Sequence, residues 1–335
     1  MNQINRYQEA VAYVAAALRE PLLRVPPDQQ EQVTEIRLRA NGPVVLVTHN
    51  RSFLCDLDGG LVKDRNSKQL MCSYECLEQT FRALCGYSVH THQREMVRGY
   101  ISLKGGHRAG LGATAVEKGG EITALKEISS INIRIARQVF NVAKPLLPYT
   151  QKGGLLLVGR PATGKTTLLR DLARLLGGEN CVGQKVVLLD ERGELAAMWD
   201  GIPQNDVGIN TDVLNGFSKT IGMEMAVRSL SPDWLICDEI GSRREAQGML
   251  GCMHAGVRII ASVHAQNETE LRRKPWVMEL LYAGVFSHIV FLNSEQGKGT
   301  IERIGRTNEW LAEGNGNSTV VGDSFAHRYP HCPLI

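Results

Sequence analysis

The sequence contains a glycine-rich stretch whose residue types and spacing could hold a polyphosphate. Residues 159–166 read GRPATGKT, which fits the pattern G-x-x-x-x-G-K-[S/T]. The glycines let the backbone curl so that successive N–H groups point at phosphate oxygens. Lys165 then brings a positive charge to the β- and γ-phosphates, and Thr166 offers its hydroxyl to Mg²⁺. The residues that we expect to bind ATP are Gly159, Arg160, Pro161, Ala162, Thr163, Gly164, Lys165, Thr166 and Thr167.

A pair of acidic residues follows an apolar stretch later in the chain. Residues 234–237 (WLIC) read as a buried strand and lead directly into Asp238 and Glu239. A carboxylate at the end of such a strand can hold the water bound to magnesium, and its neighbour can deprotonate the attacking water. We therefore predict that Asp238 serves Mg²⁺ and that Glu239 is the catalytic base. The alternative is a pair of solvated acids in a surface turn.

Two further strands are expected to end in polar side chains. Residues 190–194 (DERGE) follow the stretch VVLL and place three carboxylates within five residues. These acids either increase the negative charge near Mg²⁺ or stabilise the first turn of a solvated helix. The stretch IIASV (259–263) leads into His264, which could hydrogen-bond the γ-phosphate or the catalytic carboxylate. A structural histidine is the alternative, and Ser262 is a weaker candidate for the same role.

These candidate residues require a sheet whose strand ends meet at one edge. Helical patterns separate near-continuous apolar strands that we expect at 155–159, 186–190, 234–238, 259–263 and 288–292. This alternation predicts a parallel sheet that is covered on both faces. Ligands collect at the carboxyl edge of such sheets. The fold class that follows is α/β, with a P-loop core in the C-terminal part of the chain.

The N-terminal part shows a different, mixed pattern. Strands are expected before a helix at 73–84, and alternating segments such as ITAL (122–125) and INIRIAR (131–137) indicate a β-meander. The division that we predict is an N-terminal α+β domain at 1–137, a linker at 138–152, the ATPase domain at 153–305 and a flexible C-terminal tail at 306–335.

The composition favours a soluble, cytoplasmic protein. Apolar residues make up 43% and charged residues 22% of the 335 residues, as in ordinary globular proteins. No run of 18 apolar residues predicts a transmembrane helix, and the first residues lack the pattern of a signal peptide. The net charge is only +3, which does not indicate a surface that coats nucleic acid. We therefore expect no nucleic-acid partner.

The cysteines are expected to be reduced thiols rather than metal ligands. Cys72, Cys76 and Cys85 lie near His90 and His92, yet no C-x-x-C pair occurs in the sequence. Structural zinc sites usually contain such closely spaced pairs of ligands. We therefore predict that the protein holds no zinc.

Four motifs together resemble the type II/IV secretion ATPase group of RecA-like P-loop enzymes. In chain order they are GRPATGKT, VVLLDERGE, WLICDEIG and IIASVHAQN. They are similar to the Walker A, acidic, Walker B and histidine boxes of that group, over about residues 150–300. Within the group the chain most resembles the stage III sporulation AA family of endospore-forming bacteria. This closer resemblance extends over nearly the whole chain, through segments such as EIRLRANGPV and GYISLKGGHRAGL.

The resemblance implies a Mg²⁺-dependent ATP hydrolase of the mother cell, with a RecA-like core. It further implies a hexamer at a membrane platform, whose partners are the membrane-embedded proteins of the channel that links mother cell and forespore. In this group Glu191 would be the catalytic carboxylate of the acidic box, and arginines outside the core reach the phosphates. Arg134 and Arg137 are the candidates, with Arg108 and Arg228 as further ones. Each of these arginines could instead be a solvated surface residue.

The chain departs from the group at two points, and two other function classes stay open. Many secretion ATPases carry glycine where this chain has Asp238, and many type II members carry a four-cysteine zinc module that is absent here. RecA-like cores also serve nucleic-acid motors and recombination ATPases. The near-neutral charge and the lack of a basic stripe with interleaved aromatic residues count against that function. The other alternative is a nucleotide-switched scaffold that hydrolyses ATP too slowly to act as an enzyme.

Overall fold

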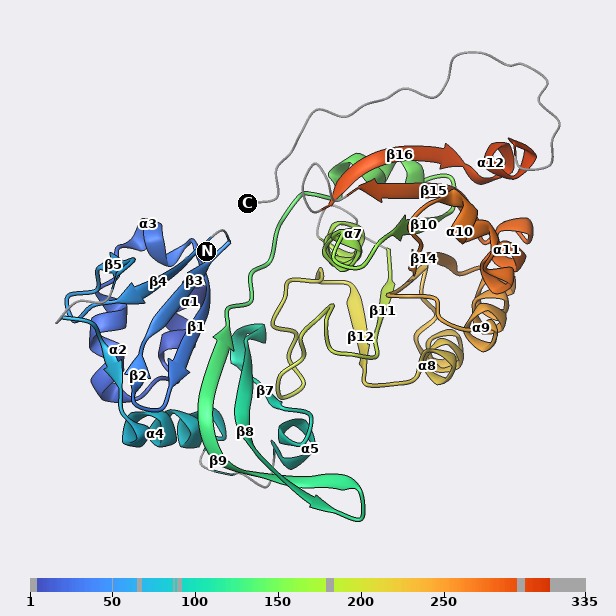
Figure 1. The fold of residues 1–335 in the computed structure, drawn as a ribbon. Coiled ribbons are helices and arrows are strands. Elements are labelled where there is room, and N and C mark those ends of the chain that lie inside the picture. Colours follow the sequence, from blue (N-terminus) through green and yellow to red (C-terminus); the bar gives the residue numbers. More distant parts are fainter. Residues whose placement is uncertain are drawn as a thin grey trace. The chain divides into compact units, whose positions relative to one another are not determined.

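The chain divides into two compact units, each with its own sheet (Figure 1). The computed structural model describes residues 5–49, 51–64, 68–86, 88, 92–178, 184–293 and 299–313. The first unit comprises Met1–Arg137 together with Trp199–Gln204, and the second comprises Gln138–Met198 and Asn205–Ile335.

The first unit is built on an antiparallel sheet with the strand order β5-β4-β3-β1-β9-β8-β7. Alternate side chains of β1, such as Ile36 and Leu38, point into one hydrophobic core. A separate short pair joins β2 and β6. The strands are β1 (Val33–Arg39), β2 (Gly42–Pro43), β3 (Val45–Thr48), β4 (Ser52–Cys55), β5 (Leu61–Val62), β6 (Met71–Cys72), β7 (Tyr100–Ser102), β8 (Arg108–Lys118) and β9 (Glu121–Arg134).

Helices cover this sheet and complete its core. The predicted helix at 73–84 is present as α4, and the hydroxyl of Ser73 caps it by accepting a hydrogen bond from the N–H of Cys76 at 3.1 Å. Its apolar side chains at helical spacing, Leu77 and Leu84, are fully buried. The helices described in this unit are α1 (Arg6–Val11), α2 (Ala16–Leu23), α3 (Pro27–Gln30), α4 (Tyr74–Leu84) and α5 (Gln93–Met96).

The predicted meander differs from the structure in one respect. The segments at 122–125 and 131–137, expected as two strands, form the single long strand β9, which pairs with β8 from Glu121 to Arg134. Between them the chain makes a bulge at Glu127, whose φ is +53°, and the pairing with β8 shifts register there. A bulge interrupts the alternation of side chains in the same way as a turn would, which explains the wrong prediction.

A short segment from the middle of the sequence belongs to the first unit. Gln204 accepts a hydrogen bond from the N–H of Gly105 through its side chain at 2.7 Å, and its carbonyl oxygen accepts one from Arg6 at 2.9 Å. The ring of Trp199 stacks on His92, with the ring centroids 6.2 Å apart. The sequence patterns did not predict this excursion, since hydrogen bonds between distant segments have no local signal.

The second unit contains a sheet with the strand order β12-β11-β13-β14-β10-β15-β16. All pairs are parallel except β15 with β16, which is antiparallel. The predicted apolar strands are present. The strands are β10 (Gly154–Gly159), β11 (Val186–Asp190), β12 (Thr211–Asn215), β13 (Trp234–Cys237), β14 (Arg258–His264), β15 (Phe286–Asn293) and β16 (Thr300–Arg306).

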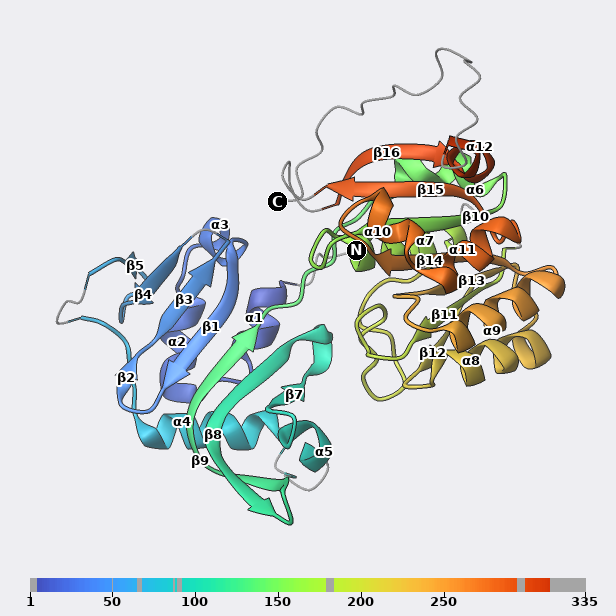
Figure 2. The same cartoon turned by 45° about the vertical axis from the view of Figure 1, so that its right-hand side comes forward.

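Helices cover both faces of this sheet (Figure 2). Leu155 and Leu157 of β10 pack with α7 on one face, while Leu156 and Val158 pack on the other face with α8, α9 and α11. Burial on both faces explains why the strands read as continuous apolar runs. The helices described here are α6 (Leu147–Thr150), α7 (Lys165–Gly177), α8 (Lys219–Met225), α9 (Arg243–His254), α10 (Glu268–Arg272), α11 (Pro275–Tyr282) and α12 (Thr307–Glu313).

Three expectations for this part of the chain need correction. The predicted linker at 138–152 is part of the second unit, and its residues Ala143 and Leu146 are fully buried in the core. The predicted tail from residue 306 begins with α12, in which Trp310 is 2% exposed and packs on Phe291. The edge strands β12 and β16 were not predicted, because half-exposed strands lack a continuous apolar run. Residues 314–335 lie outside the described residues.

Membrane insertion has no candidate helix in the described part of the chain. None of the helices found there is both long enough and apolar enough to span a bilayer.

Candidate active site

The phosphate-binding loop lies between strand β10 and helix α7. The strand ends at Gly159 and the helix begins at Lys165, so the loop faces the positive end of the helix dipole. Gly164 precedes the helix with a φ of +96°, a left-handed conformation that residues with a Cβ rarely adopt. The structure therefore has the strand, loop and helix that the predicted phosphate binding requires.

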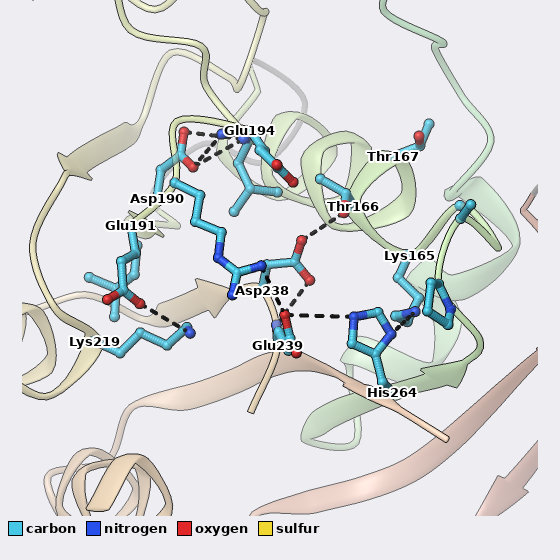
Figure 3. Close-up of a pocket in the computed structure, with 16 residues that line it drawn as sticks. Lys165, Thr166, Thr167, Asp190, Glu191, Glu194, Lys219, Asp238, Glu239 and His264 are labelled. Carbon is cyan, nitrogen blue, oxygen red and sulfur yellow. Dashed lines mark hydrogen bonds and ion pairs between the residues drawn. The ribbon is translucent and has the colours of Figure 1, made fainter. Parts of the chain in front are cut away.

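Lys165 is folded back onto this loop (Figure 3). Its Nζ donates to the carbonyl oxygens of Gly159 at 2.9 Å and Arg160 at 2.7 Å, and lies 2.9 Å from Nδ1 of His264. The residue is only 4% exposed, and this burial lowers the pKa of Lys165, whereas the carboxylates of Asp238 and Glu239 raise it. Two of its hydrogen-bond partners are neutral backbone carbonyl groups. Phosphate oxygens would replace them with stronger, charge-assisted bonds.

Thr166 and Asp238 face each other at the edge of the cavity. The hydroxyl of Thr166 donates to Oδ2 of Asp238 at 2.6 Å. The other carboxylate oxygen of Asp238 accepts hydrogen bonds from the hydroxyl of Ser262 and from the N–H of Glu239. A hydroxyl and a carboxylate are the hard oxygen donors that Mg²⁺ takes, with phosphate oxygens and waters completing its shell. This pair fits the predicted role in holding Mg²⁺.

Glu239 lies beside two other polar side chains. Its Oε2 is 3.2 Å from Nη1 of Arg192 and 3.6 Å from Nε2 of His264 (Figure 3). Its backbone is left-handed, with a φ of +43°, a strained conformation for a residue with a long side chain. The N–H of Glu239 donates to Asp238 and, at 3.0 Å, to the hydroxyl of the fully buried Ser262. Ser262 thus binds the carboxylate of Asp238 and the backbone of Glu239.

The acidic box forms a loop that Asp190 holds in place. The carboxylate of Asp190 is 2% exposed and accepts hydrogen bonds from the N–H groups of Glu194 (2.8 Å), Leu195 (3.1 Å) and Ala196 (2.8 Å). The carboxylate of Asp190 thus binds backbone N–H groups, although Asp190, Glu191 and Glu194 all line the cavity, so their joint action near Mg²⁺ stays a prediction. The alternative of a helix start is wrong, because a turn follows β11.

Glu191 points at a lysine that the sequence motifs did not predict. Nζ of Lys219 lies 3.2 Å from Glu191 and 3.9 Å from Glu245, and its side chain is only 10% exposed (Figure 3). Lys219 begins helix α8, four residues after β12 ends at Asn215. The sequence signal that could have identified Lys219 is the end of strand β12 at the same sheet edge, but β12 was not predicted.

A single cavity of about 340 Å³ brings most of the predicted residues together. Arg192 and Lys219 line it as well, although neither was predicted. Gly159, Arg160 and Thr163 shape the loop without lining the cavity. The predicted residues that line it are Pro161, Ala162, Gly164, Lys165, Thr166, Thr167, Glu191, Asp238, Glu239 and His264.

Three of the four candidate arginines belong to the first unit. Arg134 is exposed on β9, while Arg137 donates two hydrogen bonds of 2.8 Å to backbone carbonyls of the first unit. Arg108 lies over the ring of Tyr100, 4.6 Å from its centroid. Arg228 is exposed in the second unit and does not line the cavity. Contact of Arg134 or Arg137 with a nucleotide stays a prediction.

Of the three cysteines that we expect not to bind metal, Cys72 and Cys85 are buried thiols and Cys76 is partly buried. Burial raises the pKa of Cys72 and of Cys85 to about 11. Across the described residues no group of three or more His, Cys, Asp or Glu is placed to hold a metal ion. His90 lies outside those residues, and the absence of zinc stays a prediction.

Comparison with known proteins agrees with the resemblance of the motifs. Residues 4–309 match the family described as "Sporulation stage III, protein AA". The chain belongs to this family. A curated relative, "Stage III sporulation protein AA" of Bacillus subtilis (strain 168), is 35% identical over 301 residues. That match covers 88% of this chain and 94% of the relative.

Solved structures of two ATPases share the fold of this family member. The ATPase DotB of Yersinia pseudotuberculosis has a TM-score of 0.55 at 12% identity, covering 87% of this chain and 80% of that one. DotB of Legionella pneumophila has a TM-score of 0.52 at 15% identity, covering 78% and 73%. At such identities the likeness concerns the fold alone. It confirms the predicted class, an α/β RecA-like P-loop core with a smaller N-terminal α+β domain.

Proposed function

We propose that this chain is a Mg²⁺-dependent ATP hydrolase. The observation that carries the proposal is the cavity in which Lys165, Thr166, Asp238, Glu239 and His264 meet from three strand ends. A phosphate cradle, a pair of hard oxygen donors and a further carboxylate in the cavity are the groups that phosphoryl transfer from a nucleoside triphosphate to water requires.

Binding of the triphosphate would begin with Lys165. Its ammonium exchanges the carbonyl oxygens of Gly159 and Arg160 for phosphate oxygens, while the N–H groups of the loop hold the remaining phosphate charge. Thr166 and Asp238 would hold Mg²⁺, which neutralises charge on the β- and γ-phosphates when it is bound. His264 loses its contact with Lys165 in this exchange and becomes available to the γ-phosphate.

Hydrolysis would depend on Glu239 as the general base. Its carboxylate lies in the cavity and accepts the proton of the attacking water. Glu191 is the weaker candidate, because its partner Lys219 lies 3.2 Å away with a side chain only 10% exposed and also faces Glu245. The cation beside Glu239, Arg192, is 71% exposed and is therefore free to change partner. The base is therefore assigned to Glu239, with Glu191 in a supporting role.

We also propose a cellular role from the family and from the fold. The chain would work in the cytoplasm of the mother cell, at a membrane platform, as a motor of the secretion-ATPase type. Its partners would be membrane-embedded proteins of the channel between mother cell and forespore, and its assembly a homohexamer. Light scattering with and without nucleotide, and ATPase rates with and without a cytoplasmic fragment of such a membrane protein, test this role.

Replacing Lys165 with Ala should abolish tight ATP binding. Hydrogen bonds to charged groups contribute about 1.5–3 kcal/mol each, so losing the lysine should weaken binding by roughly 100-fold or more. Titration with Mg·ATP measures this effect. The exposed Lys144 provides the control, since Lys144→Ala removes a lysine of the same unit outside the cavity. Unchanged affinity in Lys165→Ala would show that the nucleotide site lies elsewhere.

The alternative functions predict different rates of ATP hydrolysis. A nucleic-acid motor should hydrolyse ATP faster when DNA is added, whereas the proposed enzyme should not respond. A nucleotide-switched scaffold should bind Mg·ATP tightly and show no turnover above background, with or without the membrane partner. Steady-state hydrolysis measured under these conditions separates the three functions.

A further inference from the structure

Arg192 lies at the tip of the acidic loop, against the candidate base. Its Nη1 is 3.2 Å from Oε2 of Glu239, and both residues line the cavity. The arginine side chain is 71% exposed, and the glutamate side chain 31%. Exposed ion pairs contribute little to stability, so the contact is not needed to hold the fold together.

The loop that carries Arg192 is fastened at both ends. Asp190 binds the backbone N–H groups of residues 194–196, and Arg170 donates to the carbonyl oxygens of Glu194 (2.6 Å) and Leu195 (2.7 Å). Gly193, next to the arginine, has a φ of +69° and lets the tip turn tightly. The backbone thus presents Arg192 to the cavity, while its exposed side chain stays free to change partner.

The other cations that line the cavity are already committed. Lys165 belongs to the phosphate cradle, and Lys219 is held between Glu191 and Glu245 with its side chain 10% exposed. In the described part of the chain Arg192 has one acidic partner, and that partner is the candidate base. A planar guanidinium also matches phosphate oxygens with two parallel hydrogen bonds, which an ammonium does not.

We propose that Arg192 exchanges Glu239 for the γ-phosphate of a bound nucleoside triphosphate. It would thus be an arginine finger that comes from the same chain as the phosphate-binding loop. This inference rests on the proposed ATP hydrolysis. The exchange has two consequences at once. The guanidinium stabilises the charge that develops on the γ-phosphate oxygens, and Glu239, released from it, becomes free to take a proton.

The reaction then balances without further reactants. The oxygen of a water molecule forms a bond to the γ-phosphorus, and the bond from that phosphorus to the bridging oxygen breaks. The electron pair of the broken bond stays on ADP, and the proton of the water passes to Glu239. Glu239 then gives this proton to the departing phosphate or to solvent, and Arg192 returns to the carboxylate, since ADP carries no γ-phosphate to hold it.

Arg192→Ala, Arg192→Lys and a matched control test this proposal. Arg243 is the control, because its side chain is 75% exposed and pairs with Glu279 at 3.8 Å, outside the cavity. The dissociation constants of Mg·ADP and of the non-hydrolysable analogue Mg·AMP-PNP are measured for each protein, together with kcat for ATP.

The expected result distinguishes the two nucleotides. In Arg192→Ala the dissociation constant of AMP-PNP should rise about 10-fold, while that of ADP stays within about twofold, because only AMP-PNP has a γ-phosphate. The kcat should fall by roughly 10²–10³-fold, the scale for removing one transition-state donor. Arg192→Lys should recover part of both losses, since it keeps the charge without the paired donors. Arg243→Ala should match the wild type.

Other outcomes overturn the proposal. Equal weakening of ADP and AMP-PNP, or a ratio of their affinities that Arg192→Ala leaves unchanged, would mean that Arg192 does not contact the γ-phosphate. A kcat within about threefold of the wild type would mean that it stabilises no transition-state charge. A wild-type chain that binds neither nucleotide would instead refute the proposed function itself, so the two failures are distinct.

Discussion

Asp238 and Glu239 are neighbours in the chain, yet the structure gives them different surroundings. Asp238 is bound through both carboxylate oxygens, to Thr166 on one side and to Ser262 on the other. Glu239 lines the cavity with its carboxylate near Arg192 and His264, which alone among the described residues lie within ion-pair distance of it. A carboxylate with fixed partners suits a metal shell, and one with exchangeable partners suits proton transfer.

Glu239→Gln and Asp238→Asn should therefore fail in different ways. The amide of Gln can still hydrogen-bond a water but cannot take its proton, so Mg·ATP binding should survive while turnover falls by roughly 10²-fold or more. Asp238→Asn should weaken Mg²⁺-dependent binding itself, because it removes a charged ligand. Hydrolysis rates and titrations with Mg·ATP measure both effects.

The control for Glu239→Gln is Glu279→Gln, which neutralises a glutamate of α11 outside the cavity and should leave turnover unchanged. Near wild-type turnover in Glu239→Gln would transfer the role of base to another carboxylate, with Glu191 the first candidate.

At the scale of elements, the loop after β11 depends on one buried carboxylate. Asp190 accepts hydrogen bonds from three successive backbone N–H groups, and Arg170 binds two carbonyl oxygens of the same turn. These contacts keep Glu191 and Arg192 at the cavity. The hydrogen bonds of Asp190, the last residue of β11, thus determine the geometry of this loop.

Asp190→Asn should loosen this loop. An amide has one acceptor oxygen and two N–H donors, so at least one buried backbone N–H group would face a donor. We expect the free energy of unfolding of the second unit to fall by about 2–3 kcal/mol. Urea unfolding measures the loss, and amide hydrogen exchange of residues 191–196 should become faster.

Asp206→Asn is the matched control, since Asp206 is exposed and its carboxylate accepts a single hydrogen bond, from the N–H of Gly208. Its effect should stay within about 0.5 kcal/mol. Equal stability of the Asp190 and Asp206 variants would contradict the role given to Asp190.

At the scale of the whole molecule, one buried histidine makes the stability of the first unit depend on pH. The first unit contains His107, which is 1% exposed and accepts a hydrogen bond from the N–H of Ala136 at 3.1 Å. Burial lowers the pKa of His107 to about 4, partly opposed by Glu9, whose carboxylate lies 3.5 Å away. The folded chain therefore keeps this histidine neutral at pH values where the unfolded chain, with an ordinary pKa of 6.5, takes up a proton.

Acidification should destabilise the first unit through His107. The stabilising contribution is fully present above pH 6.5, decreases as the pH falls, and is entirely lost below about pH 4. At pH 5 the loss should be about 2 kcal/mol. Urea unfolding between pH 7 and pH 5 measures it.

His107→Asn keeps an acceptor for Ala136 and should remove this part of the pH dependence, even if the variant is less stable overall. His254→Asn, which changes an exposed histidine of α9, should keep the wild-type pH profile. A His107→Asn variant with the wild-type slope between pH 7 and pH 5 would assign the effect to other groups.

The sequence by itself determined the chemistry of the phosphate loop and the class of the fold. A strand, a glycine-containing turn and a helix are local, so the spacing of Gly159, Gly164, Lys165 and Thr166 predicts their arrangement without any distant contact. The apolar strands predict a parallel sheet in the same local way, and each strand end marks a candidate residue.

The tertiary structure alone decided which side chains meet at that edge. In the order β11-β13-β14-β10, His264 at the end of β14 reaches Lys165, and the loop after β11 brings Arg192 to Glu239. It also tied the carboxylate of Asp190 to the backbone of the next loop and placed Lys219 against Glu191. Strand order and loop path come from packing between residues distant in sequence, and the spacing of residues along the chain does not encode them.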